Sequence, residues 1–112
     1  MCSKNKIKEI TADAAEKAKQ LLQEKLQSVI LYGSCARGEN DEESDIDILL
    51  LIDCPENSLR LYRNDIADMA SELSLQNDVT VSMLPFSTET YTKYKNAMPF
   101  LINIEKEGIK VA

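Results

Sequence analysis

An unbroken run of five apolar residues, Ile48–Ile52, constrains the fold of this chain more than any other feature. The run follows Asp45 and Asp47 and ends shortly before Pro55. A strand with apolar side chains on both faces has to be covered on both faces, so it belongs in the interior of a sheet. The run is far shorter than the ~20 apolar residues of a membrane-spanning helix. We therefore predict a central strand over Asp45–Ile52 and no membrane segment.

The other elements follow from hydrophobic periodicity and from residues that begin or end helices. The first half of the chain is predicted to contain a helix at about 12–26 with Thr11 as its N-cap, a strand over Ser28–Tyr32 and then the central strand. A helix capped by Asn57 or Ser58 and an alternating strand over Asp78–Leu84 follow. The chain ends with helices at about 88–96 and 98–107, the second with Pro99 in its first turn and Gly108 at its C′ position. This order predicts a single α/β domain over residues 1–112 with a small sheet.

The composition narrows the chemistry that this chain can perform. It has no histidine, which excludes Ser-His triads and imidazole metal ligands, so a metal has to be bound by oxygen, as Mg²⁺ prefers. Cys2, Cys35 and Cys54 are an odd number without metal-ligand spacing, and no apolar signal segment follows Met1, so we expect a reduced, cytoplasmic protein. A net charge of −6 makes a nucleic-acid partner unexpected. The acidic stretch Glu39–Glu43 is predicted to be a solvated loop.

A glycine and a serine follow the first predicted strand. Gly33 lacks a Cβ, so the backbone can turn sharply there and approach a ligand closely. Ser34 would begin a short helix, whose free N–H groups and positive dipole end favour a phosphate. Taken alone, the pair predicts only a turn.

Three aspartates are candidate metal ligands. Asp45 and Asp47 lie two residues apart on a strand, so their carboxylates project from one face and repel each other unless a cation joins them. Asp78 heads the third predicted strand, whose period-two neighbours are small and polar. Considered separately, these aspartates also have structural explanations. One of the paired aspartates would cap a loop while the other faces water, and Asp78 would be a turn residue. Together with the Gly-Ser turn, however, they meet the needs of phosphoryl transfer, which are a cradle for a triphosphate and two metal ions ~4 Å apart.

The complete motif resembles that of nucleotidyltransferases of the polymerase-β type. It consists of Gly33-Ser34, ten further residues that include Ala36-Arg37-Gly38, and then Asp45-Ile46-Asp47; the later segment Pro99–Ile109 is also similar. Within this superfamily the chain resembles the minimal nucleotidyltransferase (MNT) group, including the MntA-like antitoxins of HEPN/MNT toxin–antitoxin pairs. The resemblance implies a small mixed β-sheet packed by helices on one side.

The resemblance also implies a role for each motif residue. Gly33 and Ser34 would contact the β- and γ-phosphates of ATP. Asp45 and Asp47 would bind two Mg²⁺ ions. Asp78 would be a third carboxylate, shared with the catalytic metal and favouring deprotonation of the acceptor hydroxyl.

The resemblance implies that the acceptor is a tyrosine of a partner HEPN ribonuclease, which transfer of AMP from ATP would silence. Related enzymes carry a further domain that presents the acceptor, so here we expect a partner to supply it. Two alternatives stay open: a binding-only antitoxin that masks its partner, and a nucleotidyltransferase acting on a small molecule or RNA with a separate acceptor-binding subunit. The sequence leaves the nucleotide, the acceptor and the oligomeric state open.

Two further features have alternative explanations. Arg37 would either help to neutralise the triphosphate or tie the acidic loop in place. A group of apolar residues near the C-terminus is predicted to form the core and lid of this domain, with a partner surface as the alternative; the group consists of Tyr91, Tyr94, Met98, Phe100 and Leu101.

Overall fold

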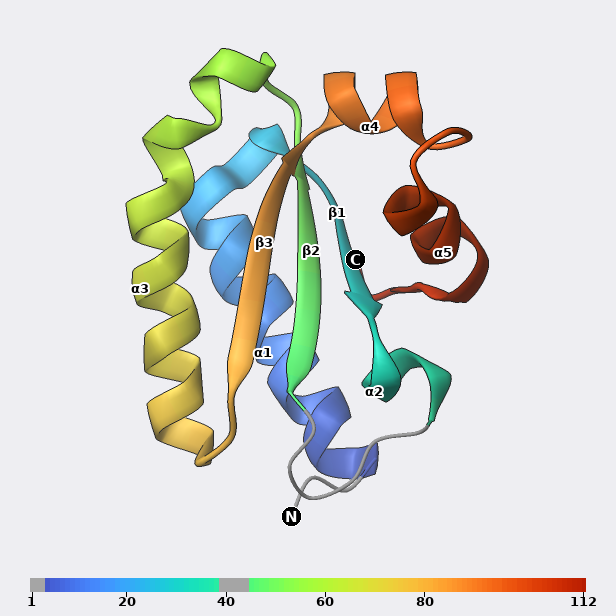
Figure 1. The fold of residues 1–112 in the computed structure, drawn as a ribbon. Coiled ribbons are helices and arrows are strands. Elements are labelled where there is room, and N and C mark those ends of the chain that lie inside the picture. Colours follow the sequence, from blue (N-terminus) through green and yellow to red (C-terminus); the bar gives the residue numbers. More distant parts are fainter. Residues whose placement is uncertain (1–3, 39–44) are drawn as a thin grey trace.

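A computed structural model of the chain describes residues 4–38 and 45–112, so the predicted loop at 39–43 and Cys2 lie outside the described part. Its centre is a four-stranded sheet in the order β3-β2-β1-β4 (Figure 1). The strands are β1 (Leu26–Tyr32), β2 (Ile46–Ile52), β3 (Val81–Ser87) and β4 (Ile109–Lys110). β2 pairs with β3 in parallel, whereas β1 is antiparallel to both β2 and β4. The small mixed sheet expected from the sequence is confirmed.

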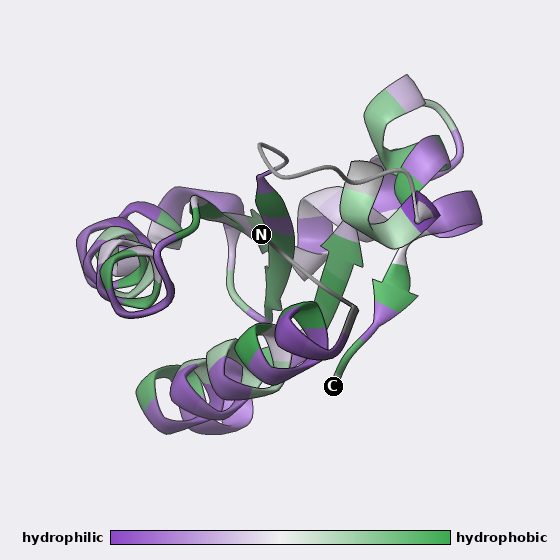
Figure 2. Ribbon diagram, turned by 90° about the horizontal axis from the view of Figure 1, so that it is seen from below, coloured by the Kyte–Doolittle hydropathy of each residue, from purple (hydrophilic) through white to green (hydrophobic). Residues whose placement is uncertain are grey.

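Five α-helices surround this sheet in the described part of the chain. They are α1 (Lys4–Leu22), α2 (Ser34–Arg37), α3 (Arg60–Asn77), α4 (Thr88–Tyr94) and α5 (Pro99–Glu107), with short 3₁₀ turns at Gln23–Lys25 and Glu56–Ser58. The long helices α1 and α3 lie on one side of the sheet, as expected (Figure 2). The short helices α4 and α5 pack against part of the other side, which the expectation of helices on one side did not include.

The central strand is confirmed in detail. Alternate residues of β2, from Ile46 to Ile52, pack into the cluster formed with α1 and α3. The intervening residues Leu49 and Leu51 pack into a second cluster with α4 and α5. The strand is therefore buried on both faces along most of its length, and only Asp47 interrupts the apolar pattern within it.

Two predicted helix caps are wrong. α1 begins at Lys4, so Thr11 lies inside the helix, where its hydroxyl donates to the Lys8 carbonyl oxygen at 3.1 Å. The helix extends further because Ile7 and Ile10 continue the apolar stripe that packs against the sheet. α3 begins after Leu59 without any side-chain cap, and Asn57 and Ser58 lie in the preceding 3₁₀ turn.

The predicted start of the third strand is also wrong. β3 begins at Val81, whereas Asp78 is the C-cap of α3 and has a left-handed backbone with φ of 52°. Aspartate tolerates this conformation better than most residues because its short polar side chain bonds locally. The alternation within the strand is as predicted, since Val81 and Met83 pack toward α1 and α3 and Ser82 projects from the opposite face. Pro85 is accommodated because β3 is an edge strand.

The C-terminal segment begins as predicted, with Pro99 in the first turn of α5. Gly108 ends the helix, but with an extended backbone and not the left-handed conformation usual at C′. A Cβ there would lie 2.7 Å from Cγ2 of Ile30 and 2.6 Å from the Ile104 carbonyl oxygen. Glycine is therefore needed because α5 passes close to β1. The two-residue strand β4 that follows was not predicted.

The apolar residues near the C-terminus were predicted to form the core and lid of this domain, with a partner surface as the alternative, and the structure divides them into buried and exposed members. Tyr91 and Leu101 are buried, as the core explanation requires. Burial, and then the carboxylate of Glu105, which accepts a hydrogen bond from the phenol, raise the pKa of Tyr91 to about 12. Tyr94, Met98 and Phe100 remain 37–39% exposed. Across residues 4–38 and 45–112, no helix combines the length and apolar character needed to cross a membrane.

Candidate active site

The turn between β1 and α2 has the conformation that its glycine predicted. Gly33 has a φ of 76°, in the left-handed region that favours glycine. Its carbonyl oxygen accepts hydrogen bonds from the backbone N–H groups of Ala36 and Arg37, at 3.1 and 3.2 Å. α2 begins at Ser34, of which the structure describes only the backbone. The chain thus folds back into one helical turn directly after the strand.

The Gly33 turn lies directly against Asp47. β1 and β2 pair so that Tyr32 is opposite Asp47, which brings that carboxylate beside the end of β1. A Cβ added to Gly33 would lie only 2.7 Å from Oδ2 of Asp47. Both the backbone conformation and the space therefore require glycine at this position.

Asp45 and Asp47 form a pair of neighbouring carboxylates. Asp47 is half-buried on β2, and Asp45 precedes that strand and is exposed. Burial raises the pKa of Asp47, and the negative charge of Asp45 raises it further. The effect of one charge on the other indicates that the two carboxylates lie near each other.

Cys35 connects the turn after β1 to the residue before β2, a contact that was not predicted. Its thiol on α2 donates to the carbonyl oxygen of Asp45 at 3.3 Å. The side chain is buried. The contact positions the residue before β2 relative to the turn after β1, although the two are ten residues apart in sequence. A lone cysteine within the motif gave no signal of this role.

Tyr32 is a second neighbour of Asp47 that sequence reasoning missed. Burial, followed by the charge of Asp47, raises the pKa of its phenol. Its ring meets Phe100 of α5 edge to face, with centroids 5.5 Å apart. The pair therefore connects the end of β1 to the start of α5 beside the carboxylates.

Arg37 contacts the C-terminal helix. Its Nη1 lies 3.4 Å from Oε2 of Glu107, the last residue of α5, and both side chains are substantially exposed. The acidic loop at 39–43, the other partner considered from the sequence, lies outside the described residues. The ion pair thus connects α2 to α5 at the rim of the site, a contact for which Glu107 gave no sequence signal.

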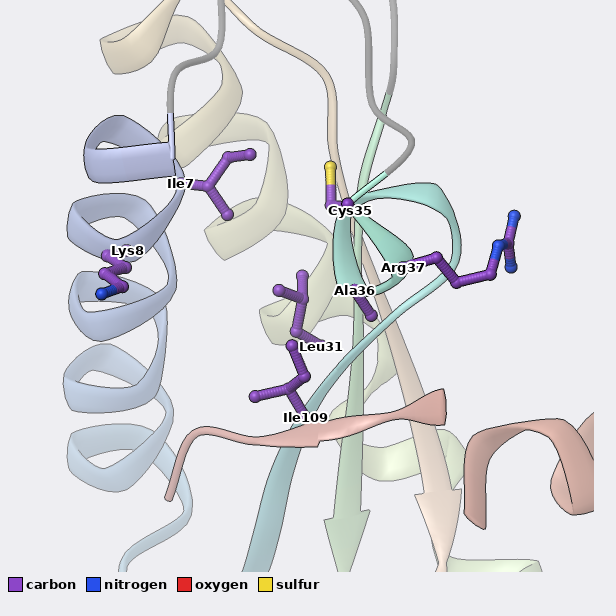
Figure 3. A pocket seen from close by; sticks show the side chains of 8 residues that line it. Ile7, Lys8, Leu31, Cys35, Ala36, Arg37 and Ile109 are labelled. Atoms are coloured by element: carbon purple, nitrogen blue, oxygen red, sulfur yellow. The ribbon is translucent and has the colours of Figure 1, made fainter. Parts of the chain in front are cut away.

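Two cavities adjoin α2. One, of about 210 Å³, lies between the Gly33 turn and α5; its lining residues are Tyr32, Gly33, Arg37, Phe100, Asn103, Ile104 and Glu107. The other, of about 290 Å³, is mainly apolar and lies between α1, α2 and β4 (Figure 3). Ile7, Leu31 and Ile109 are grouped in it, whereas the guanidinium of Arg37 points away from them. Neither cavity has Asp45 or Asp47 in its lining, but the smaller one is lined by Gly33, whose turn lies against Asp47.

Asp78 does not join the aspartate pair. It lies at the turn between α3 and β3, beside a hollow that it shares with Ser74 and Thr80. Within residues 4–38 and 45–112, no group of three or more acidic or cysteine side chains is placed to hold a metal ion. The prediction of a three-carboxylate cluster is therefore wrong for the described part of the chain. The physical reason is that the helix extends to Asn77, which makes Asp78 its cap.

The fold and the site define a small α/β domain in which a glycine turn after β1 lies against the Asp47 carboxylate on β2. The nucleotidyltransferase domain family matches this chain over residues 12–111. The chain belongs to this family, and it is a nucleotidyltransferase.

Two relatives from Methanocaldococcus jannaschii are similar over much of the chain. "Putative protein adenylyltransferase MJ0141" is 33% identical over 103 residues, which cover 92% of this chain and 96% of that protein. "Putative protein adenylyltransferase MJ0604" is 33% identical over 84 residues, which cover 75% of this chain and 76% of that protein.

Solved structures share the fold at lower identity. A toxin–antitoxin crystal structure with AMP-PNP has a TM-score of 0.56 and 18% identity, covering 90% of this chain and 72% of the other. A complex of a tri-AMPylated Shewanella oneidensis HEPN toxin with its MNT antitoxin has a TM-score of 0.51 and 18% identity, covering 94% of this chain and 71% of the other. These likenesses establish the fold.

Proposed function

We propose that this chain is an Mg²⁺-dependent nucleotidyltransferase that transfers AMP from ATP to a tyrosine of a partner HEPN-domain protein, and thereby acts as an antitoxin. The observation that carries the proposal is the contact between the Gly33 turn and Asp47, where a Cβ would lie 2.7 Å from the carboxylate. It brings the proposed phosphate-binding and metal-binding halves of the motif into one place.

The residues present fit a magnesium ion. Mg²⁺ is commonly bound through one or two carboxylates together with substrate phosphates and water, and not by a complete protein cage. Asp45 and Asp47 supply two carboxylates, and their mutual repulsion would be relieved by a cation. When bound, Mg²⁺ neutralises charge on the triphosphate and polarises its phosphoryl oxygens. Asp78 has no part in this proposal.

The protein's own contribution is positioning. The Gly33 turn and the start of α2 would hold the triphosphate, and Ser34 would supply a donor to it. Cys35 holds the Asp45 backbone against α2, which keeps the carboxylate pair in place relative to the turn. In the reaction, the acceptor oxygen bonds to the α-phosphorus of ATP, the bond from that phosphorus to the bridging oxygen breaks, and pyrophosphate leaves.

A protein acceptor is supported by the relatives. Two of them are named as protein adenylyltransferases, and one structural neighbour is an MNT antitoxin with an AMPylated HEPN toxin. The use of ATP is supported by the neighbour that was crystallised with AMP-PNP. A cytoplasmic setting is supported by three cysteines, an odd number without metal-ligand spacing.

The test is to incubate the protein with Mg²⁺, labelled ATP and the product of the adjacent gene. We expect label on a tyrosine of that partner. Asp47→Asn should lower the labelling rate by roughly 10²–10³-fold, because it removes a charge that the transition state requires. Asp65→Asn, an exposed aspartate on α3, is the matched control and should label normally.

The alternative functions give different results in the same assay. A binding-only antitoxin would neutralise its partner equally well as Asp47→Asn and would transfer no label. A nucleotidyltransferase for a small molecule or RNA would form pyrophosphate only when that acceptor is added. Either result would overturn the proposed tyrosine transfer.

A further inference from the structure

The side chain nearest to Asp47 on the adjacent strand is Ser82. β2 and β3 run parallel with Asp47 in register with Ser82, so these residues lie side by side at the inter-strand spacing of about 4.8 Å. Residues paired in this way project from the same face of a sheet. Val81 and Met83 on either side of Ser82 pack into the α1 and α3 cluster, which confirms that Ser82 faces the other way.

Tyr32, Asp47 and Ser82 therefore form one row across β1, β2 and β3. Helices α4 and α5 cover the next part of this face, where Leu49 and Leu51 are buried. The row itself is less covered, with Asp47 half-buried and Ser82 exposed. A ligand held at Asp47 would therefore have Ser82 as its neighbour on the β3 side.

We propose that Ser82 occupies the position at which a third carboxylate would stand beside Asp47, and that it thereby limits the acceptor to hydroxyls that ionise readily. This inference rests on the proposed function and names the residue that would decide the acceptor class. Within the described ranges, no group of three or more acidic or cysteine side chains is placed to hold a metal ion, and Asp78 lies at a separate turn.

The chemical reason concerns the acceptor's proton. As the acceptor oxygen bonds to the α-phosphorus and pyrophosphate leaves, the acceptor has to release its proton to a base or to water. A carboxylate at position 82 would accept that proton, and a positioned general base is worth roughly 10²–10⁴-fold in rate. The hydroxyl of Ser82 is no base at neutral pH.

An acceptor with an acidic hydroxyl needs this help least. A tyrosine phenol has a pKa of about 10, whereas the pKa of an aliphatic hydroxyl, like that of water, is far higher. A site with two carboxylates is therefore suited to phenols and poorly suited to serine, threonine or ribose hydroxyls.

The first test measures binding and needs no acceptor. Mn²⁺ and AMP-PNP are titrated together into the wild type and into Ser82→Asp, Ser82→Asn and Asp78→Asn by calorimetry. We expect Ser82→Asp to tighten binding roughly tenfold, because a carboxylate added near a cation contributes about one pKa unit or more of charge interaction. Ser82→Asn, the neutral variant of similar size, and Asp78→Asn should stay within about twofold.

The second test measures acceptor choice with N-acetyltyrosinamide and N-acetylserinamide in the presence of labelled ATP. The wild type should label the tyrosine compound at least roughly a hundredfold faster, and Ser82→Asp should raise labelling of the serine compound by a similar factor. Because Ser82 is exposed on an edge strand, these variants should fold; Ser82→Glu replaces Ser82→Asp if thermal unfolding shows otherwise.

The outcomes separate this inference from the proposed function. A wild type that binds no Mn²⁺ and AMP-PNP overturns both. If the wild type binds normally but Asp78→Asn binds tenfold more weakly, only the inference is overturned. The same holds if Ser82→Asp and Ser82→Asn bind equally tightly. Equal labelling of the tyrosine and serine compounds by the wild type also overturns it.

Discussion

The two faces of β2 differ in what covers them. On one face, α1 and α3 cover alternate side chains of the strand, and these are almost completely buried; they are Ile46, Ile48, Leu50 and Ile52. On the other face, Leu49 and Leu51 are sealed by α4 and α5, whereas Asp47 at the start of the strand is only half-buried. One seven-residue strand thus contributes to two separate cores and to the candidate active site.

This difference shows how a small domain can use one face of a strand for stability and the start of the other face for a candidate active site. Two neighbouring like charges are unfavourable, so they are tolerated only where the surrounding fold is rigid. The sealed face supplies that rigidity, since Ile46 and Ile48 flank Asp47 and anchor the backbone that carries it. Substitutions on the two faces should therefore have different effects, and the following predictions test this separation.

The largest effect on stability is expected at Ile48, which is fully buried beside Asp47. Ile48→Ala should lower the free energy of unfolding by about 2–5 kcal/mol, because it leaves a cavity in the core. Ile48→Val is the graded control and should cost about 0.5–1.5 kcal/mol. Urea unfolding measures both. If the folded fraction of Ile48→Ala has lost nucleotide binding, the two faces are not separable.

A matched pair of glycine substitutions tests the turn. Gly33 and Gly38 both have a left-handed backbone, with φ of 76° and 74°, so alanine should cost about 1–2 kcal/mol of stability at either position. Only at position 33 would the new Cβ reach Asp47, because among the described residues, chain neighbours aside, no atom lies within 4 Å of a Cβ at position 38. Gly33→Ala should therefore lose transferase activity and Gly38→Ala should retain it. Equal activity in the two variants would contradict the importance of this contact.

Asp47 should oppose folding while it is ionised. Its pKa is raised in the folded state, so the native protein binds the proton more tightly than the unfolded chain, and stability is lost as the pH rises through the raised pKa. Asp47→Asn should therefore stabilise the metal-free protein at pH 7 by at most about 1 kcal/mol. The difference should disappear below the ordinary pKa of 3.8. Thermal unfolding from pH 3 to pH 8 measures it, and a destabilised variant at pH 7 would refute the repulsion.

The smallest effect is expected at the rim pair of Arg37 and Glu107. Because both side chains are substantially exposed, Glu107→Gln should cost only about 0.2–1 kcal/mol. Comparing it with Arg37→Gln separates the possible roles of the arginine. Weaker ATP binding in Arg37→Gln alone indicates contact with the triphosphate. Equal, small changes in both variants indicate a purely structural tie between α2 and α5.

Much of the fold could be predicted because local patterns and tertiary packing agree. The run Ile48–Ile52 is buried on both faces, as an apolar strand has to be. Gly33 turns as its missing Cβ allowed, and Pro99 begins a helix. The helix caps were less predictable because Thr11 has the chemistry of a cap but lies on a stripe that the sheet buries.

The candidate site was predictable only in part, for the same reason. Asp45 and Asp47 are close in sequence, so strand periodicity alone places them together. Asp78 was placed wrongly because its position depends on where α3 ends, which packing decides and local pattern does not. Ser82, Tyr32 and Glu107 approach the site only through strand register and the return of the C-terminus.

The sequence by itself determined the central strand, the glycine turn and the aspartate pair, because each depends on neighbours within a few residues. The tertiary structure alone decided which side chain stands beside Asp47 on the next strand. That choice depends on the parallel register of β2 and β3, which joins residues 35 positions apart and follows from the crossover through α3, a helix that packs against β3.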